Sequence, residues 1–532
     1  MLFTSYGFIA FLAAVFLVYY LCPPKRQWTV LLAASYVFYA FSGLWNFAFI
    51  LSVTVCCYVI ARILARMKAK EDAEVEQNRA TWSKDERKQY RAKSKKRRFS
   101  VLAVGITVNI GILAVIKYTA FAITNVNSLL GLFGAEPLRV PTLILPMGIS
   151  FFVFQSVAYI IDVYRGKTFA ETNIARFALF VSFFPQLVQG PISRHSSLAS
   201  QLYEPHSFDG VKFKFGLQRI LWGFFKKLVI ADRIMVAIKP LISVDSTYDG
   251  AYVFLLIIFY SIQIYADFTG GIDITIGIAE ALGMRLAENF NRPFSSRTTK
   301  EYWNRWHITM GSWFTDYIFM PLSLSPTLLK LSKRVREKGS LVSVAIGKRI
   351  PVYTATVVTW FLTGLWHGAA WNFIVWGLLN CLVILVSQEL EPLYRKFRNK
   401  HPRLVSSYPY HCFEATRTFL IMGLIRSLDC YRNVGVTFAM WGSMFTKFNW
   451  NELFNGGISS LGLKAVDYVI IGIGVLTVFV VSKLGQKRDL RQALVGKTAL
   501  SWTLTGIMLI VVLLLGAYGM GYDASQFIYN QF

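Results

Sequence analysis

Long apolar segments alternate with short polar connections along most of the chain. The first three apolar segments cover residues 6–21, 28–41 and 46–64. Each has about the length that an α-helix needs to cross roughly 30 Å of hydrocarbon. Later segments of the same character cover residues 101–123, 252–265, 352–366, 371–387, 466–481 and 502–518. The pattern predicts a helical protein that crosses a membrane many times.

Two further apolar regions are interrupted by residues that break helices. Region 143–163 carries Pro146 and Gly148 near its start, and region 177–191 ends in a Gly-Pro pair. Segments broken in this way often enter a membrane without crossing it and line a protein-enclosed cavity. The amphipathic segment 433–445 is expected to lie along the interface. We predict an all-α polytopic membrane protein with roughly ten to twelve transmembrane helices, plus re-entrant and interfacial helices, around a central tunnel.

The distribution of charge predicts the orientation of these spans. Residues 66–98 include 13 basic and 6 acidic residues, and the run ends in four consecutive basic residues. Basic connections remain on the cytoplasmic side, so this stretch is expected inside. Three spans precede it, which places the N-terminus outside and agrees with Lys25 and Arg26 lying inside. By the same rule, the basic stretches 330–349 and 395–403 are cytoplasmic.

Composition excludes most other classes of protein. Of the 532 residues, 55% are hydrophobic and 16% are charged, whereas soluble domains carry about 25% charge. A soluble enzyme, a disordered chain and a disulfide scaffold are therefore excluded. We attribute the net charge of +27 to cytoplasmic connections and anionic lipid headgroups, not to nucleic acid. The six cysteines have no metal-binding spacing, and we expect no metal site.

Two of the six histidines stand out. Four lie in polar stretches and are expected to be solvated, namely His195, His206, His401 and His411. His367 lies between two apolar spans, and the 16 steps along the chain from Pro351 to His367 correspond to roughly 24 Å of helix, which places it toward the outer face. An ionisable group at membrane depth is costly and therefore a candidate for function. The alternative is an interfacial histidine packed among tryptophans, and it applies to His307 as well.

Several motifs occur in a characteristic order along the chain. They are Pro146–Phe152 with Ile161–Gly166, Phe183–Pro191, Asp267–Gly270, Asn289–Phe294, Tyr302–Ile308, Leu365–Gly368 and Phe527–Phe532. Together they resemble the membrane-bound O-acyltransferase family, in its bacterial branch of alginate O-acetyltransferases. The resemblance covers essentially the whole chain. It implies a single membrane domain made of N-terminal transmembrane helices (1–65), a basic cytoplasmic loop (66–99), the family core with both histidines (100–390) and C-terminal helices (391–532).

The resemblance also implies a reaction. The family moves an acyl group from a cytoplasmic thioester to a hydroxyl on the other side of the membrane. His367 matches the family's active-site histidine and is expected to be the general base, since an imidazole with a pKa near 6.5 suits that role; an acyl-histidine intermediate is the less favoured variant. His307 matches the second histidine and is expected to orient the acceptor or polarise the thioester carbonyl. Expected neighbours that bind substrate are Trp303, Asn304, Trp306, Trp366 and Asn372.

Cofactor, partners and location follow from the same resemblance. No bound cofactor is expected, and the acyl donor is expected to be acetyl-CoA or another acyl thioester. Expected partners are an extracytoplasmic acetyltransferase and a polysaccharide acceptor, with membrane lipid around the chain and no nucleic acid. The expected location is the plasma (inner) membrane, with multiple crossings.

Other functions remain open at this point. The first alternative is a D-alanyl transfer protein for teichoic acids, ranked lower because this chain is longer and ends in residues 527–532 as the alginate branch does. A transporter or flippase would use Asp267, Asp273 and Glu280 as a relay. A scaffold for a glycan synthase would have no chemistry of its own.

Overall fold

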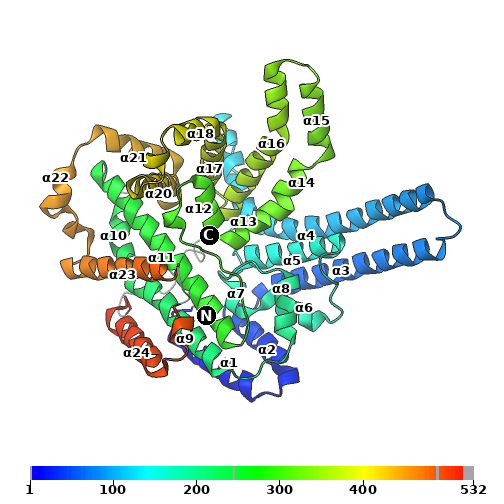
Figure 1. The fold of residues 1–532 in the computed structure, drawn as a ribbon, viewed down its shortest axis with the longest axis horizontal. Helices are drawn as coiled ribbons and strands as arrows, with labels where there is room; N and C mark the ends of the chain where they lie inside the picture. The colour runs from blue at the N-terminus through cyan, green and yellow to red at the C-terminus, as the bar shows by residue number, and fades with distance from the viewer. Residues whose placement is uncertain (1–2, 244–245, 487–489, 519–532) are drawn as a thin grey trace. The chain divides into compact units, whose positions relative to one another are not determined.

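Helices make up the regular structure of the chain. The computed structural model describes residues 3–243, 246–486 and 490–518, and the motif 527–532 lies outside them. Within these ranges the regular elements are helices, apart from one isolated antiparallel bridge between Phe290 and Trp306 (Figure 1). The all-α prediction is confirmed.

The chain forms two compact units. Unit 1 comprises residues 1–217 and 275–287, and unit 2 comprises residues 218–274 and 288–532. The boundaries between the units fall inside two helices, α9 (Gly210–Phe224) and α11 (Ala251–Ala281). These units follow from packing, whereas the predicted division into four sequence segments follows hydropathy and charge, and that division stays a prediction.

Unit 1 is built largely from N-terminal helices. They are α1 (Tyr6–Leu21), η1 (Pro24–Arg26), α2 (Gln27–Ala40), α3 (Asn46–Gln77), α4 (Lys84–Leu132), α5 (Ile149–Arg165), α6 (Ile174–Ser182), α7 (Phe184–Leu187) and α8 (His195–Tyr203). The start of α1 is set by Ser5, whose side chain accepts a hydrogen bond from the Phe8 N–H. Helix α5 begins after Gly148, which has a left-handed φ of 72°. The predicted interruption near Pro146 is therefore present as a helix start.

The predicted basic loop at residues 66–99 is not a loop. Helix α3 continues to Gln77 and α4 begins at Lys84, so the two form a helical hairpin (Figure 1). Many residues here are Ala, Lys, Glu and Arg, which favour helix, and Ser83 and Glu86 form a capping box at the start of α4. A buried ion pair between Arg98 and Glu71 (3.0 Å) joins the two helices.

Unit 2 contains the longer second half of the chain. Its remaining elements are η2, a π-helical stretch (Phe225–Ala231), α10 (Asp232–Ile242), η3 (Pro293–Ser295), α12 (Thr299–Arg305), α13 (Ile308–Phe314), η4 (Thr315–Phe319), α14 (Met320–Ser323), α15 (Pro326–Arg336), α16 (Leu341–His367), α17 (Trp371–Glu389), α18 (Glu391–Lys400), α19 (Pro402–Val405), α20 (Tyr408–Tyr431), α21 (Val434–Thr446), α22 (Trp450–Glu452), η5 (Leu453–Gly457), η6 (Ser459–Leu461), α23 (Ala465–Leu484), η7 (Gln492–Leu494) and α24 (Thr498–Leu515).

Seven of the described helices are long and apolar enough to cross a membrane. They are α3, α4, α11, α16, α17, α23 and α24, and α1 and α21 are shorter apolar helices. The predicted segment 252–265 is part of a longer helix, α11, which continues to Ala281. A polytopic membrane protein is confirmed, and the predicted count of roughly ten to twelve crossings stays a prediction.

Helix α16 packs closely against α17, and this packing positions the C-terminal end of α16. A β-carbon on Gly364 would come within 2.5 Å of the Phe373 carbonyl oxygen, and one on Gly377 within 2.4 Å of the Trp360 carbonyl oxygen. Small residues let the two backbones approach in this way. This close approach at Gly364 brings the end of α16, with His367, against the start of α17.

Candidate functional site

His367 is the last residue of α16 and is partly buried. Its ring centroid lies 4.6 Å from that of Trp376 and 5.0 Å from that of Trp366, both in edge-on geometry. Trp376 belongs to α17, so the side chain is held where the two helices meet. The imidazole therefore has aromatic neighbours from both helices.

His307 lies in the short connection between α12 and α13 and is fully buried, with 0% exposure. Its backbone has φ 48° and ψ 53°, a left-handed conformation that is unfavourable for a residue with a side chain. Strained residues of this kind cluster at functional sites, where the surrounding structure holds them. The ring packs edge-on against Phe268, with centroids 4.9 Å apart.

Trp366 contacts both histidines. Its indole lies 6.0 Å from the His307 ring and 5.0 Å from the His367 ring, measured between centroids. The two histidines are 60 residues apart in the sequence, and the fold brings them to one indole. Trp366 thus lies between the two histidines, and its expected role in binding substrate stays a prediction.

Asn289 holds the segment around His307. Its backbone oxygen accepts from the Ile308 N–H (2.9 Å), and its side-chain Oδ1 accepts from the Thr309 N–H (3.0 Å) and hydroxyl (2.9 Å). The same Oδ1 lies 3.3 Å from Nδ1 of His307. Since a backbone N–H can only donate, the atom that faces it must be the amide oxygen. Nδ1 of His307 therefore carries the proton, and Nε2 carries the lone pair.

Burial also controls the charge of His307. Loss of hydration inside the protein lowers the pKa of this imidazole to about 3. At neutral pH the ring is therefore uncharged. A neutral ring with its tautomer set by Asn289 has a basic nitrogen in a defined direction, which is the form that accepts a proton or a hydrogen bond.

A cavity of about 1200 Å³ adjoins this site. Helices α12, α13, α16, α17, α18 and α20 line it, and its walls include three of the predicted substrate-binding residues, Trp303, Asn304 and Trp306. The histidines are not among its lining residues. Ile308, which follows His307, and Thr363, one helical turn before His367, both line it.

The cavity wall contains polar groups that have no protein partner. Among the described residues, Trp303 Nε1, Thr299 Oγ1 and Thr359 Oγ1 are buried and make no hydrogen bond. Buried polar atoms without a partner are rare, because each one costs free energy. A ligand or water in the cavity would satisfy them. The wall therefore offers hydrogen-bond donors and acceptors beside aromatic surface.

Charged residues gather on the part of the cavity wall formed by α18 and α20. They include Glu391, Arg398, Glu414 and Arg417. None of the cavity's lining residues comes from 143–163 or 177–191, the segments that we expected to line a tunnel. Those segments fold as helices α5 to α7 of unit 1, whereas this cavity lies within unit 2.

Asn372 is buried at the start of α17, and its expected role in binding substrate stays a prediction. Its side-chain Nδ2 donates to the Leu428 carbonyl oxygen (3.2 Å), which joins α17 to α20. It does not line the cavity.

Sequence reasoning missed several residues near the site. Asn289 begins the motif Asn289–Phe294, which predicts no role for it, and Trp376 lies outside the motifs. Arg426 is buried; its guanidinium lies 4.0 Å from the Trp306 ring centroid and donates to the Tyr302 hydroxyl (2.8 Å). A charged residue at the end of an apolar helical run was the available signal for Arg426.

His195 is not solvated, contrary to expectation. It is 2% exposed, and its ring packs on Tyr159 and Phe180, with centroids 4.7 Å and 5.0 Å away. The aromatic residues around it come from α5, α6 and, at Phe169, the connection between them, which a polar local sequence does not reveal. Burial lowers the pKa of His195 to about 4.

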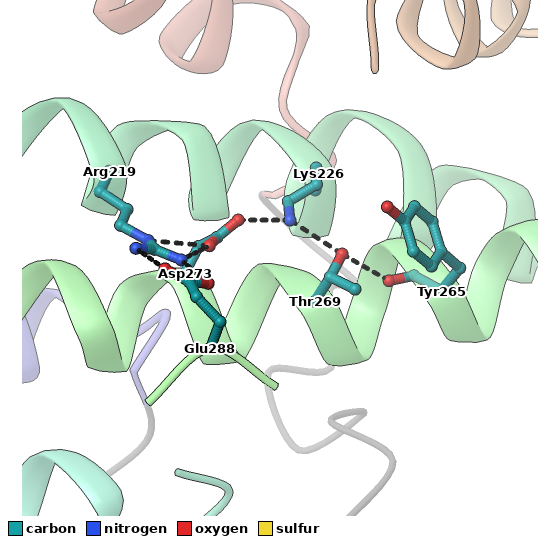
Figure 2. Close-up of polar contacts among 6 residues, drawn as sticks. All are labelled: Arg219, Lys226, Tyr265, Thr269, Asp273 and Glu288. Atoms are coloured by element: carbon teal, nitrogen blue, oxygen red, sulfur yellow. Dashed lines mark hydrogen bonds and ion pairs between the residues drawn. The ribbon is translucent and has the colours of Figure 1, made fainter. Parts of the chain in front are cut away.

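Two of the three carboxylates considered for a transport relay, Asp267 and Asp273, are engaged in ion pairs. Asp267 lies 2.6 Å from the ammonium of Lys227. Asp273 binds both Lys226 and Arg219, as Figure 2 shows. Buried charges need such partners. The structure thus gives both aspartates a structural role.

Comparison with known proteins identifies the family. A family model for the membrane-bound O-acyltransferases matches residues 168–336, which include His307. The probable alginate O-acetylase AlgI of Azotobacter vinelandii is 31% identical over 89% of this chain and 84% of its own length. The peptidoglycan O-acetyltransferase of Helicobacter pylori is 30% identical over 57% of this chain and 58% of its own length. The teichoic acid D-alanyltransferase of Bacillus subtilis is 27% identical over 47% of this chain and 61% of its own length.

The alignment with the Azotobacter relative covers 89% of this chain. It therefore includes both histidine-bearing regions and most of the membrane helices. The protein is an O-acyltransferase of the membrane, and the chain belongs to the membrane-bound O-acyltransferase family.

Proposed function

We propose that the protein transfers an acetyl group from a cytoplasmic thioester to hydroxyls of an extracytoplasmic polysaccharide, with His367 as the general base. The observation that carries this proposal is the arrangement of His307 and His367 on one indole beside the large cavity. The names of the relatives, an alginate O-acetylase and a peptidoglycan O-acetyltransferase, support a polysaccharide acceptor.

The proposed chemistry needs a base and a group that orients the acceptor. The acceptor hydroxyl attacks the thioester carbonyl as His367 takes its proton. The tetrahedral intermediate collapses as the C–S bond breaks, and the proton passes from His367 to the departing thiolate. A new C–O ester bond replaces the C–S bond. His307 would orient the acceptor through Nε2, the nitrogen that its contact with Asn289 leaves basic.

The cavity supports entry of the donor from the cytoplasm. Charged residues of α18 on the cavity wall lie in or next to the basic stretch 395–403. The distribution of charge places this stretch on the cytoplasmic side. The volume of about 1200 Å³ is ample for the pantetheine arm of acetyl-CoA. Acetyl-CoA is therefore the proposed donor, and no bound cofactor takes part. The proposed location is the inner membrane, with an extracytoplasmic acetyltransferase as partner.

D-alanyl transfer is the second candidate, because one relative is a teichoic acid D-alanyltransferase. Shared chemistry around a thioester and a hydroxyl makes the two functions hard to separate by geometry. The lower coverage of that relative, 47% of this chain against 89% for the alginate relative, favours acetyl transfer. Transport is disfavoured, since the aspartates that a relay would use are ion-paired.

The experiment uses sealed membrane vesicles of both orientations that contain the full-length protein and the host's polysaccharide. Radiolabelled acetyl-CoA is supplied outside, and alkali-labile label on polysaccharide is measured. We expect transfer in inside-out vesicles, and none in right-side-out vesicles. Label incorporated only from a D-alanyl thioester would support the second candidate. Incorporation in right-side-out vesicles alone would contradict the proposed direction.

A further inference from the structure

Glu288, the residue before Asn289, is held by an arginine from a distant part of the sequence. Arg219 of α9 donates from Nη1 to Oε1 of Glu288 (2.7 Å) and from Nη2 to Oε2 (2.6 Å). The same guanidinium donates from Nε to Oδ1 of Asp273 on α11 (3.0 Å). Figure 2 shows both carboxylates converging on Arg219. Only the planar fork of a guanidinium binds two carboxylates in this way.

The inner end of this network is buried and tightly connected. Lys226, in the π-helical stretch η2, has a side chain that is 5% exposed, and it binds Asp273 and the Thr269 hydroxyl (2.8 Å). The Thr269 hydroxyl in turn donates to the Tyr265 carbonyl oxygen (2.6 Å). Since removal of one partner from such a set leaves a costly buried charge, the network favours one arrangement. The network therefore holds the Arg219 guanidinium in one position, and Arg219 in turn holds the Glu288 carboxylate.

We propose that Arg219 and Glu288 are positioning residues for acyl transfer, which hold the backbone at 288–289 so that Asn289 presents its oxygen to His307. This proposal rests on the proposed function, since it requires His307 to act in the transfer. The path is short: Glu288 is joined to Asn289 by one peptide bond, and Asn289 contacts His307, Ile308 and Thr309. None of the network residues lines the cavity proposed for the donor.

A substitution at Glu288 distinguishes a positioning role from a purely structural one. Arg219 and Asp273 also join α9 to α11, so their loss would weaken the fold in any case. The Glu288 side chain is 60% exposed, and its neutralisation leaves the pairs of Asp273 with Arg219 and Lys226 in place. Glu288→Gln therefore tests the link to Asn289 with little effect on helix packing.

The test uses full-length protein in inside-out vesicles with acetyl-CoA as the probe. For Glu288→Gln we expect a kcat about tenfold lower and an unchanged KM for acetyl-CoA, because the reacting groups are misplaced and the donor cavity is untouched. Glu288→Asp keeps the charge and is expected to recover most of kcat. The matched control is Glu389→Gln, which weakens a similar bidentate contact with Arg349 and is expected to leave kcat unchanged.

A double variant tests the proposed path. If Glu288 acts through Asn289, then Glu288→Gln adds no further loss of kcat to Asn289→Ala, whereas independent effects would multiply. Should Asn289→Ala be inactive, Asn289→Asp takes its place; should Glu288→Gln fail to fold, Arg219→Lys, which keeps the charge and loses the fork, takes its place. A wild-type kcat for Glu288→Gln, or multiplied losses, would overturn the inference.

The two proposals fail in different ways. Full activity of His307→Ala and His367→Ala would overturn the proposed function, and this inference with it. Loss of activity in both histidine variants, together with a wild-type kcat for Glu288→Gln, would overturn the positioning role alone.

Discussion

The side-chain oxygen of Asn289 lies 3.3 Å from Nδ1 of His307 and also accepts from the backbone N–H of Thr309. One amide thus fixes the left-handed turn before α13 and the tautomer of the buried imidazole. Because the oxygen is identified by the backbone N–H, the direction of the basic nitrogen of His307 follows from hydrogen bonding alone.

Asn289→Ala is expected to affect both stability and turnover. It leaves buried donors of His307 and Thr309 without their acceptor, at a cost of about 1–3 kcal/mol. Thermal unfolding in detergent should show the loss of stability, and the rate of acetyl transfer should fall. Asn289→Asp, which retains an acceptor oxygen, is expected to keep more of both. Equal behaviour of the two variants would argue against the role assigned to the oxygen.

Gly364→Ala is expected to disturb the junction of α16 and α17. The new methyl group would lie 2.5 Å from the Phe373 carbonyl oxygen, so the helices must separate, at a cost of about 1–3 kcal/mol. Activity should fall with stability, since His367 ends α16. The control is Gly472→Ala on α23, where no atom lies within 4 Å. Unchanged unfolding and activity in Gly364→Ala would contradict the close packing.

Trp303→Phe tests the cavity as the donor site. The Trp303 Nε1 atom is buried and has no partner among the described residues, and the residue lines the cavity. If acetyl-CoA satisfies it, the variant loses one hydrogen bond, and the KM for acetyl-CoA rises about fivefold. Trp45→Phe, at an indole that is 89% exposed, serves as the control. An unchanged KM in Trp303→Phe would show that the donor does not use this group.

Stability should fall as pH is lowered from 7 to 5. Burial holds the pKa of folded His307 at about 3, below its unfolded value of about 6.5. Below pH 6.5 the unfolded chain therefore binds a proton that the folded chain does not bind. Stability consequently decreases with falling pH, by about 2 kcal/mol at pH 5 for a single group. The buried His195 acts in the same direction.

The measurement compares unfolding midpoints at pH 7 and pH 5. His307→Gln is expected to show a smaller drop than the wild type, while His411→Gln, at a half-buried histidine outside the site, shows the same drop as the wild type. An equal drop in His307→Gln and wild type would mean that His307 is not buried in its neutral form.

Local patterns predicted much of the helical structure. The apolar run at 6–21 is helix α1 with the same bounds, because hydropathy and the Ser5 cap act over neighbouring residues. The stretch 66–98 is mostly helical although its polarity favours a loop, because many of its residues are Ala, Lys, Glu and Arg, which have high helix propensity. Both patterns are local.

The site was predictable only in part. His307, His367 and Trp366 were identified from motifs, and the fold brings them together. The contact of Asn289 with His307 spans 18 residues and depends on a left-handed turn that no periodicity indicates. Arg219 and Glu288 are farther apart still, so their pairing depends on how α9 and α11 pack.

In the proposed mechanism, acyl transfer depends on the His367 imidazole as its base. Alkali-labile acetate on the surface polysaccharide is quantified in cells that produce His367→Ala, with His411→Ala as the matched control and equal amounts of folded protein in the membrane. We predict a loss of about 100-fold or more in His367→Ala and wild-type acetate in His411→Ala. Wild-type acetate in His367→Ala would contradict the account.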